Sequence, residues 1–209
     1  MRADEIEALF TRSDGSYLCA RWGRPLAPVV FGVKDETLGI VKGAIEAVVA
    51  LAGQPLAETD PELGANLMIF FLRNWDELTG VPHLEMLIEE LGPLVERLNS
   101  AGANQYRAFR FDAEGGIQAC FAFVRMDGEL ADASAETIAL STAVQAILLW
   151  SDQAFDLRPA LARVPSGAVI LRPEIAAVIR AAYDPALPVM ARDPSHALRL
   201  AARTREGLA

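Results

Sequence analysis

The stretch that decides the fold class lies in the middle of the chain, where residues 106–126 read YRAFRFDAEGGIQACFAFVRM. Apolar and aromatic residues recur on both sides of residues 113–116, AEGG. Two glycines in so short a connection supply the positive backbone angles that a tight reversal needs. We therefore predict a β-hairpin made of residues 106–112 and 117–126.

A helix that is apolar on nearly every side is predicted directly after the hairpin. Residues 134–151 read SAETIALSTAVQAILLWS, and Ser134 is a suitable N-cap. A helix of this kind lies in the centre of a domain. Its polar residues Thr137, Ser141 and Gln145 stand four apart, so they form one narrow polar stripe along the helix.

Strands and helices alternate in the first half of the chain. The patterns predict a short strand over 26–33, a helix from the N-cap Asp35 to Gly53, and a strand over 66–72 that is buried on both faces. Gly39 and Gly43 lower the helix propensity, so we expect them to mark close packing against another element.

Two more helices are predicted further along. One follows Pro82 and should be kinked or split at Gly92-Pro93, because proline removes a backbone donor. The other spans residues 173–183, with proline in its first turn. Together the elements predict an α+β fold with a mixed sheet, a β-hairpin, a central buried helix and packing helices.

The chain has 209 residues, of which 52% are apolar, enough for a single domain over 1–209. We expect residues 1–20 to form a peripheral N-terminal arm. We also expect residues 191–209, which carry four arginines but only two acidic residues from position 192 on, to form a peripheral, solvated basic tail.

The net charge of −9 repels phosphate backbones and anionic lipid headgroups, so nucleic-acid and membrane partners are not expected. No signal peptide and no apolar run long enough to span a bilayer are visible, which favours a soluble, cytoplasmic protein. Cys19 and Cys120 lack metal-site spacing and are expected to be buried thiols. In an exported protein the two could instead pair.

Four short motifs in a shared order resemble a known family. They are GANLMIFF at 64–71, CF at 120–121 followed by RMDG at 125–128, VQAILL at 144–149 and AYDPAL at 182–187. This order resembles the zincin metallopeptidases, and more specifically an uncharacterised bacterial family of zincin-like domains of unknown function. The resemblance covers about residues 21–190. It implies that the buried helix carries the site and that a peptide lies along the edge strand of the sheet.

The buried helix departs from the zincin pattern at the positions that matter for catalysis. Active zincins carry HExxH there, with two zinc ligands and a glutamate general base. The matching positions here are Ser141, Thr142 and Gln145, whose neutral oxygens are weak zinc ligands. The unknown-function family generally shows acidic and glutamine residues in this stretch, so this chain departs further still. We predict no catalytic residue, no metal and no cofactor, and we regard Thr137, Ser141, Thr142 and Gln145 as candidates that line a cleft.

Other chemistries have weaker signals. His83 and His196 stand alone, Ser166 lacks the GxSxG elbow, and Cys120 lies in an apolar strand where its pKa should be raised. Glu85, Glu89 and Glu90 belong to the polar side of an amphipathic helix. None of these residue patterns predicts a metal site, a nucleophile or a phosphate-binding loop.

Two readings of the polar stripe stay open. In the first, its side chains satisfy neighbouring backbone groups; in the second, they line a remnant cleft that binds a peptide or a small ligand. The leading hypothesis is a non-catalytic binding or structural module with a peptide or protein partner. One alternative is a hydrolase with an unconventional site near Ser141 and Gln145, and another is an assembly protein whose apolar surface is covered by a second copy.

Overall fold

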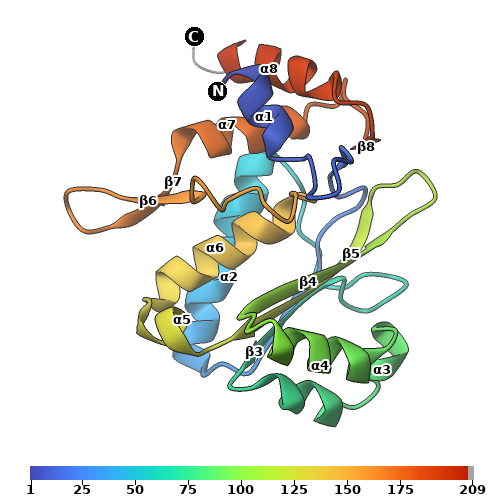
Figure 1. The fold of residues 1–209 in the computed structure, drawn as a ribbon, viewed down its shortest axis with the longest axis vertical. Helices are drawn as coiled ribbons and strands as arrows, with labels where there is room; N and C mark the ends of the chain where they lie inside the picture. The colour runs from blue at the N-terminus through green and yellow to red at the C-terminus, as the bar shows by residue number, and fades with distance from the viewer. Residues whose placement is uncertain (207–209) are drawn as a thin grey trace.

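The computed structural model describes residues 1–206, apart from the side chains of Glu129 and Glu206, and is built on a mixed four-stranded sheet (Figure 1). The strand order is β2 (Pro28–Phe31), β3 (Leu67–Leu72), β5 (Ile117–Arg125) and β4 (Gln105–Phe111). β2, β3 and β5 run parallel, and β4 pairs antiparallel with β5 along the sheet edge. The predicted α+β class and mixed sheet are confirmed.

The β4–β5 hairpin forms where the glycine-containing turn predicts it. The backbone N–H of Asp112 donates to the carbonyl of Gly116 at 2.9 Å, and the Asp112 carboxylate accepts from the N–H groups of Glu114 and Gly116. Gly115 has φ +81°, a left-handed conformation that favours glycine. Local turn chemistry thus fixes the register of the two longest strands.

Helices cover both faces of the sheet. α2 (Asp35–Ala52) and α6 (Ala135–Ile147) pack together on one face, over the side chains of Ile69, Cys120 and Ala122. The other face is covered by η1 (Trp75–Gly80), α3 (Leu84–Leu87) and α4 (Leu91–Ser100), over Phe70 and Phe121. β3 is therefore buried on both faces, as its continuous apolar run predicts.

The helix α2 begins at Asp35, one residue earlier than an Asp35 N-cap would give, and it ends at Ala52, followed by the C-cap Gly53 in the predicted left-handed conformation. The prediction of close packing at Gly39 and Gly43 is wrong. Both glycines are exposed, and a Cβ atom added at either position would meet nothing within 4 Å. They lower the stability of the helix without enabling a contact.

The second predicted helix is split, but not at Gly92-Pro93. α3 ends at Leu87, and α4 begins at Leu91 after Glu90 adopts the left-handed conformation, φ 52°. Pro93 then lies in the first turn of α4, where backbone N–H groups have no partner within the helix. The break therefore precedes the proline and costs no helical hydrogen bond at that position.

The central helix α6 starts at the predicted N-cap Ser134, whose hydroxyl accepts from the N–H of Thr137, but it ends at Ile147 and not at Ser151. Two side chains from distant parts of the sequence donate hydrogen bonds to its last carbonyl groups. Trp22 Nε1 donates to Ala146 O at 2.9 Å, and the Tyr183 hydroxyl donates to Ile147 O at 2.7 Å. The chain then leaves the helix, and Leu149 N–H donates to the carbonyl of Ala20.

Three helices cluster beyond one end of α2 and α6: α1 (Ala3–Ala8), α7 (Pro173–Ala182) and α8 (His196–Glu206) (Figure 1). The two ends of the chain are not peripheral. Ile6 and Phe10 are fully buried, and so is Leu200 of α8. The predicted solvated tail is in fact an amphipathic helix up to Glu206; residues 207–209 lie outside the described part of the chain.

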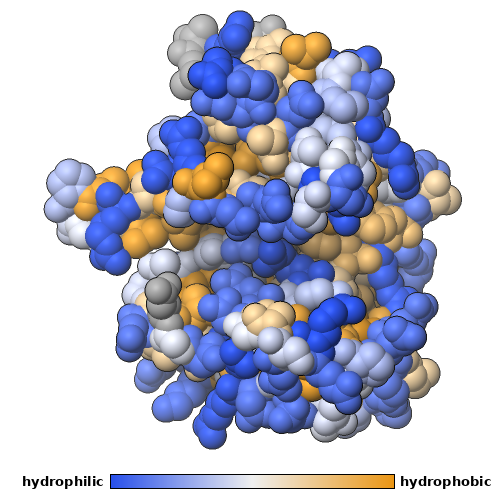
Figure 2. All heavy atoms as spheres, in the orientation of Figure 1, coloured by the Kyte–Doolittle hydropathy of each residue, from blue (hydrophilic) through white to orange (hydrophobic). Residues whose placement is uncertain are grey.

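Several small elements complete the fold. β1 (Cys19–Ala20) pairs with β8 (Met190–Ala191), and α5 (Gly128–Asp132) links β5 to α6. β6 (Leu161–Arg163) and β7 (Val169–Leu171) form a hairpin that projects from the body as an arm, with apolar atoms visible along it (Figures 1 and 2).

Within residues 1–206, no helix has both the length and the apolar character that crossing a membrane would require.

Candidate functional site

The polar stripe of α6 opens into a pocket of about 260 Å³. Thr137, Ser141 and Gln145 form its floor and are half-buried. The walls come from the start of β4, from α5 and from the loop that leads to the β6–β7 arm. The lining residues are Gln105, Leu130, Ala133, Thr137, Ile138, Ser141, Gln145, Phe155, Pro159, Ala160 and Leu161. Figure 2 shows the surface hollowed below the level of the arm.

Two glutamine side chains and one serine meet on this floor. Gln145 Nε2 donates to Ser141 Oγ at 2.9 Å and to Oε1 of Gln105, the first residue of β4, at 3.3 Å. The stripe is therefore bonded to one side chain across the pocket, that of Gln105, which links the central helix to the edge strand. Thr137 lies one turn earlier, where its hydroxyl contacts that of the N-cap Ser134 at 3.0 Å.

Thr142 is the one candidate that does not reach the pocket. It is buried, with 4% of its surface exposed, and it is not among the lining residues. Successive residues of a helix are turned by 100° about its axis, so Thr142 leaves the stripe although it directly follows Ser141. The structure thus brings together three of the four predicted residues and adds Gln105, which lies 40 positions from Gln145.

Among the described residues that line the pocket, none carries a charged group that could hold a metal ion or act as a general base. Among the side chains that the structure describes, no three His, Cys, Asp or Glu residues lie together as a metal site. His83 is exposed at the start of α3, whereas His196 is buried in α8, where its Nδ1 lies 3.0 Å from the Tyr17 hydroxyl. The chemistry available in the pocket is therefore hydrogen bonding by neutral groups.

The nucleophile candidates lie elsewhere. Ser166 belongs to the turn at the tip of the β6–β7 arm. Cys120 is fully buried under α6, and burial raises the pKa of its thiol to about 12. Cys19 is buried as well, and burial likewise raises its pKa. Both are free thiols, and both are protonated and shielded at neutral pH.

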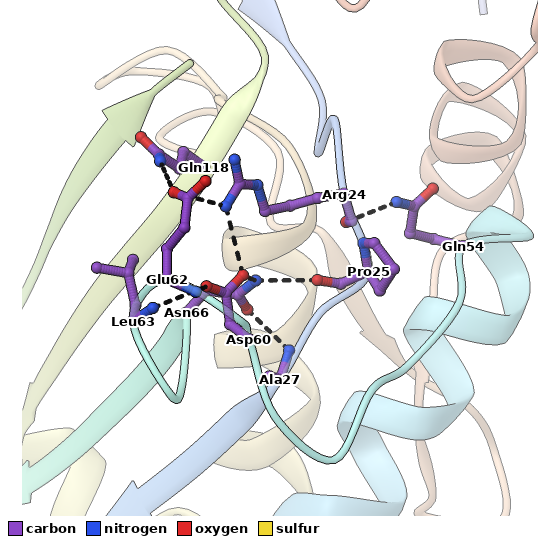
Figure 3. Close-up of polar contacts among 9 residues, drawn as sticks. All are labelled: Arg24, Pro25, Ala27, Gln54, Asp60, Glu62, Leu63, Asn66 and Gln118. Atoms are coloured by element: carbon purple, nitrogen blue, oxygen red, sulfur yellow. Dashed lines mark hydrogen bonds and ion pairs between the residues drawn. The ribbon is translucent and has the colours of Figure 1, made fainter.

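A second polar cluster lies at the amino-terminal ends of β2 and β3 (Figure 3). Asn66 is fully buried; its Oδ1 accepts from Ala27 N–H at 2.7 Å, and its Nδ2 donates to Pro25 O and to Asp60. Asp60 is buried, which by itself raises its pKa, but hydrogen bonds from the N–H groups of Leu63 and Glu62, from Asn66, and the charge of Arg24 lower it overall.

The buried Asn66 and Asp60 are hydrogen-bonded to each other, and Asn66 also bonds the backbone of Pro25 and Ala27. The cluster therefore joins the loop before β3 to the segment that leads into β2. Arg24 adds ion pairs to Asp60 at 3.5 Å and to Glu62 at 3.1 Å. The sequence does not predict this cluster, because its only signal there is an asparagine at the start of an apolar strand. Its contacts explain that asparagine structurally, without a ligand.

A groove of about 540 Å³ runs along the other side of β4, between this strand and the α3–α4 turn. Glu89 and Glu90 line it and are exposed as predicted, but they lie in the turn between α3 and α4 and not on the polar side of a helix. Arg97 and Arg110 lie on the same groove, and the Arg110 guanidinium donates to the carbonyl of Leu87. The edge strand is thus flanked by the neutral pocket near its start and by a charged groove along its other face.

Comparison with known proteins gives no match, whether to a protein-family model, to a curated protein or to a solved structure.

Proposed function

We propose that this protein is a binding module that holds an extended segment of another polypeptide along the edge strand β4, with one side chain of that segment in the α6 pocket. The observation that carries the proposal is the contact between Gln145 and Gln105. It places the pocket at the first residue of a strand that is last in its sheet. A single ligand can therefore engage the edge and the pocket together.

The outer edge of β4 has backbone groups available for pairing. Arg125 N–H donates to Asn104 O at 2.8 Å just before β4 begins. In an antiparallel pair the bonded residues alternate. The backbone N–H and C=O groups of Gln105, Arg107 and Phe109 consequently point away from β5. Strand addition to such an edge is a common mode of peptide recognition, in which pockets for alternate side chains give specificity.

The same pocket does not favour hydrolysis. Ser141 Oγ accepts a hydrogen bond from an amide N–H of Gln145, which cannot remove its proton, whereas a serine nucleophile needs an adjacent base. The zincin-like resemblance supports a non-catalytic role as well, because the matched positions carry hydroxyl and amide groups in place of zinc ligands and glutamate. We therefore propose binding without cleavage.

Peptide selection tests the proposal. Peptides selected from a random dodecapeptide display library are titrated against the wild type and against Thr137→Phe, which fills the floor of the pocket. We expect at least about a tenfold loss of affinity, or about 1.4 kcal/mol. Glu136→Phe is the matched control, because it adds the same ring one residue away at an exposed position.

Two outcomes would contradict the proposal. If Thr137→Phe binds the selected peptides as tightly as Glu136→Phe does, the pocket takes no part in recognition. If mass spectrometry shows that the wild type cleaves the selected peptides, with or without added zinc, the protein is a hydrolase.

A further inference from the structure

We propose that the α6 pocket selects a neutral primary carboxamide on an aliphatic stem, the chemistry of a glutamine side chain. This inference rests on the proposed function, since it names the side chain that the bound segment would place in the pocket. It follows from three properties of the lining, namely its lack of charge, its unused hydrogen-bonding groups and its apolar walls.

No Asp, Glu, Lys, Arg or His is found among the lining residues in the part of the chain that the structure describes. A carboxylate or ammonium group that enters loses water and gains no opposite charge, which is strongly unfavourable. Arg107 lies two residues after Gln105, so both side chains point to the α6 side of β4. Arg107 is not among the lining residues. The pocket therefore favours a neutral guest.

The hydrogen bonds on the floor leave a specific set of groups unused. Gln145 donates hydrogen bonds from its Nε2 to Ser141 and Gln105, which leaves its Oε1 free as an acceptor. Gln105 keeps its Nε2 as a donor, and Ser141 keeps its hydroxyl proton. None of these three groups has a partner among the side chains and backbone described for residues 1–206. A site with one acceptor and two donors matches a primary carboxamide, which offers both N–H and C=O.

The remaining walls suit a short hydrocarbon stem. Leu130, Ile138, Phe155 and Leu161 supply apolar surface around the three polar groups. A pocket of about 260 Å³ has room for the few methylene groups and the amide of such a side chain. An aliphatic guest without the amide would leave the donors and the acceptor of the floor unpaired, which such sites reject strongly.

Three small probes of matched length separate these requirements. Hexanamide carries the full amide, 2-heptanone keeps the carbonyl but lacks the N–H groups, and hexanoate carries a charge. Each is titrated into ¹⁵N-labelled protein, and amide shifts are followed by NMR. We expect hexanamide to bind at least about tenfold more tightly than either of the other two, as expected where a polar site meets a guest lacking its hydrogen-bonding groups.

Variants test whether the side-chain amides of Gln145 and Gln105 cause the preference for hexanamide. Gln145→Met and Gln105→Met keep the length of each side chain and remove its amide, so we expect the preference for hexanamide over 2-heptanone to fall below about threefold, while 2-heptanone still binds. Arg107→Met should leave the preference in place. NMR spectra of the unbound variants report whether each one is folded.

The outcomes separate this inference from the proposed function. Equal binding of hexanamide and 2-heptanone, or no binding of hexanamide, overturns the carboxamide inference even if selected peptides bind. Tightest binding by hexanoate that is lost in Arg107→Met overturns it in favour of an anion site. Preference for hexanamide in a protein that binds no selected peptide supports the carboxamide site and contradicts the peptide-binding function.

Discussion

Replacing Asn66 by alanine should destabilise the protein far more than the loss of three side-chain atoms would suggest. Asn66 is fully buried and makes three hydrogen bonds, at 2.7, 2.9 and 3.0 Å (Figure 3). Asn66→Ala leaves the buried N–H of Ala27 without its partner and removes one hydrogen bond from the carboxylate of Asp60. Each buried group left unpaired costs about 1–3 kcal/mol, so we expect a loss of about 2–5 kcal/mol.

Urea denaturation followed by tryptophan fluorescence measures this loss. With a slope near 2 kcal/mol/M, the midpoint should fall by about 1–2.5 M. Gln118→Ala is the control, because it removes one hydrogen bond to the exposed carboxylate of Glu62 and should cost less than about 0.5 kcal/mol. Equal midpoints for the two variants would refute the view that this cluster joins the loop before β3 to β2.

Three further predictions concern stability. Gly39→Ala and Gly43→Ala should each stabilise α2 by about 0.5–1 kcal/mol, because both positions are exposed and a Cβ meets nothing there; a lower melting temperature would contradict this. Gly32→Ala should markedly destabilise the protein in the same melting assay, because φ is +80° and a Cβ would lie 2.0 Å from Phe71 O. Burial of His196, with the charges of Arg199 and Arg203, lowers its pKa, so the unfolded chain binds this proton more readily. Unfolding free energy should therefore fall as pH drops below about 6.5, and less steeply in His196→Gln if this histidine is the cause.

The sequence predicts those parts of the fold that local patterns determine. The glycines at 115 and 116 predict the hairpin, and the four-residue spacing of Thr137, Ser141 and Gln145 predicts which residues share a side of α6. Both signals come from neighbouring residues, and backbone geometry alone converts them into structure.

Long-range contacts determine the rest. α6 ends early because Trp22 and Tyr183 donate hydrogen bonds to its last carbonyl groups, and neither residue lies near the helix in the sequence. The C-terminal segment is helical and packed because α1 and α7 provide an apolar surface for α8. The partner of Gln145 in the pocket is Gln105, which no spacing rule connects to it.

An amide hydrogen-exchange map of the protein with and without a selected peptide shows whether the peptide pairs with the edge of β4. We expect slower exchange at the outward-facing N–H groups of β4, at residues 105, 107 and 109, together with intact peptide at the end of the experiment. Protection confined to another part of the molecule, or a peptide recovered in fragments, would contradict this expectation.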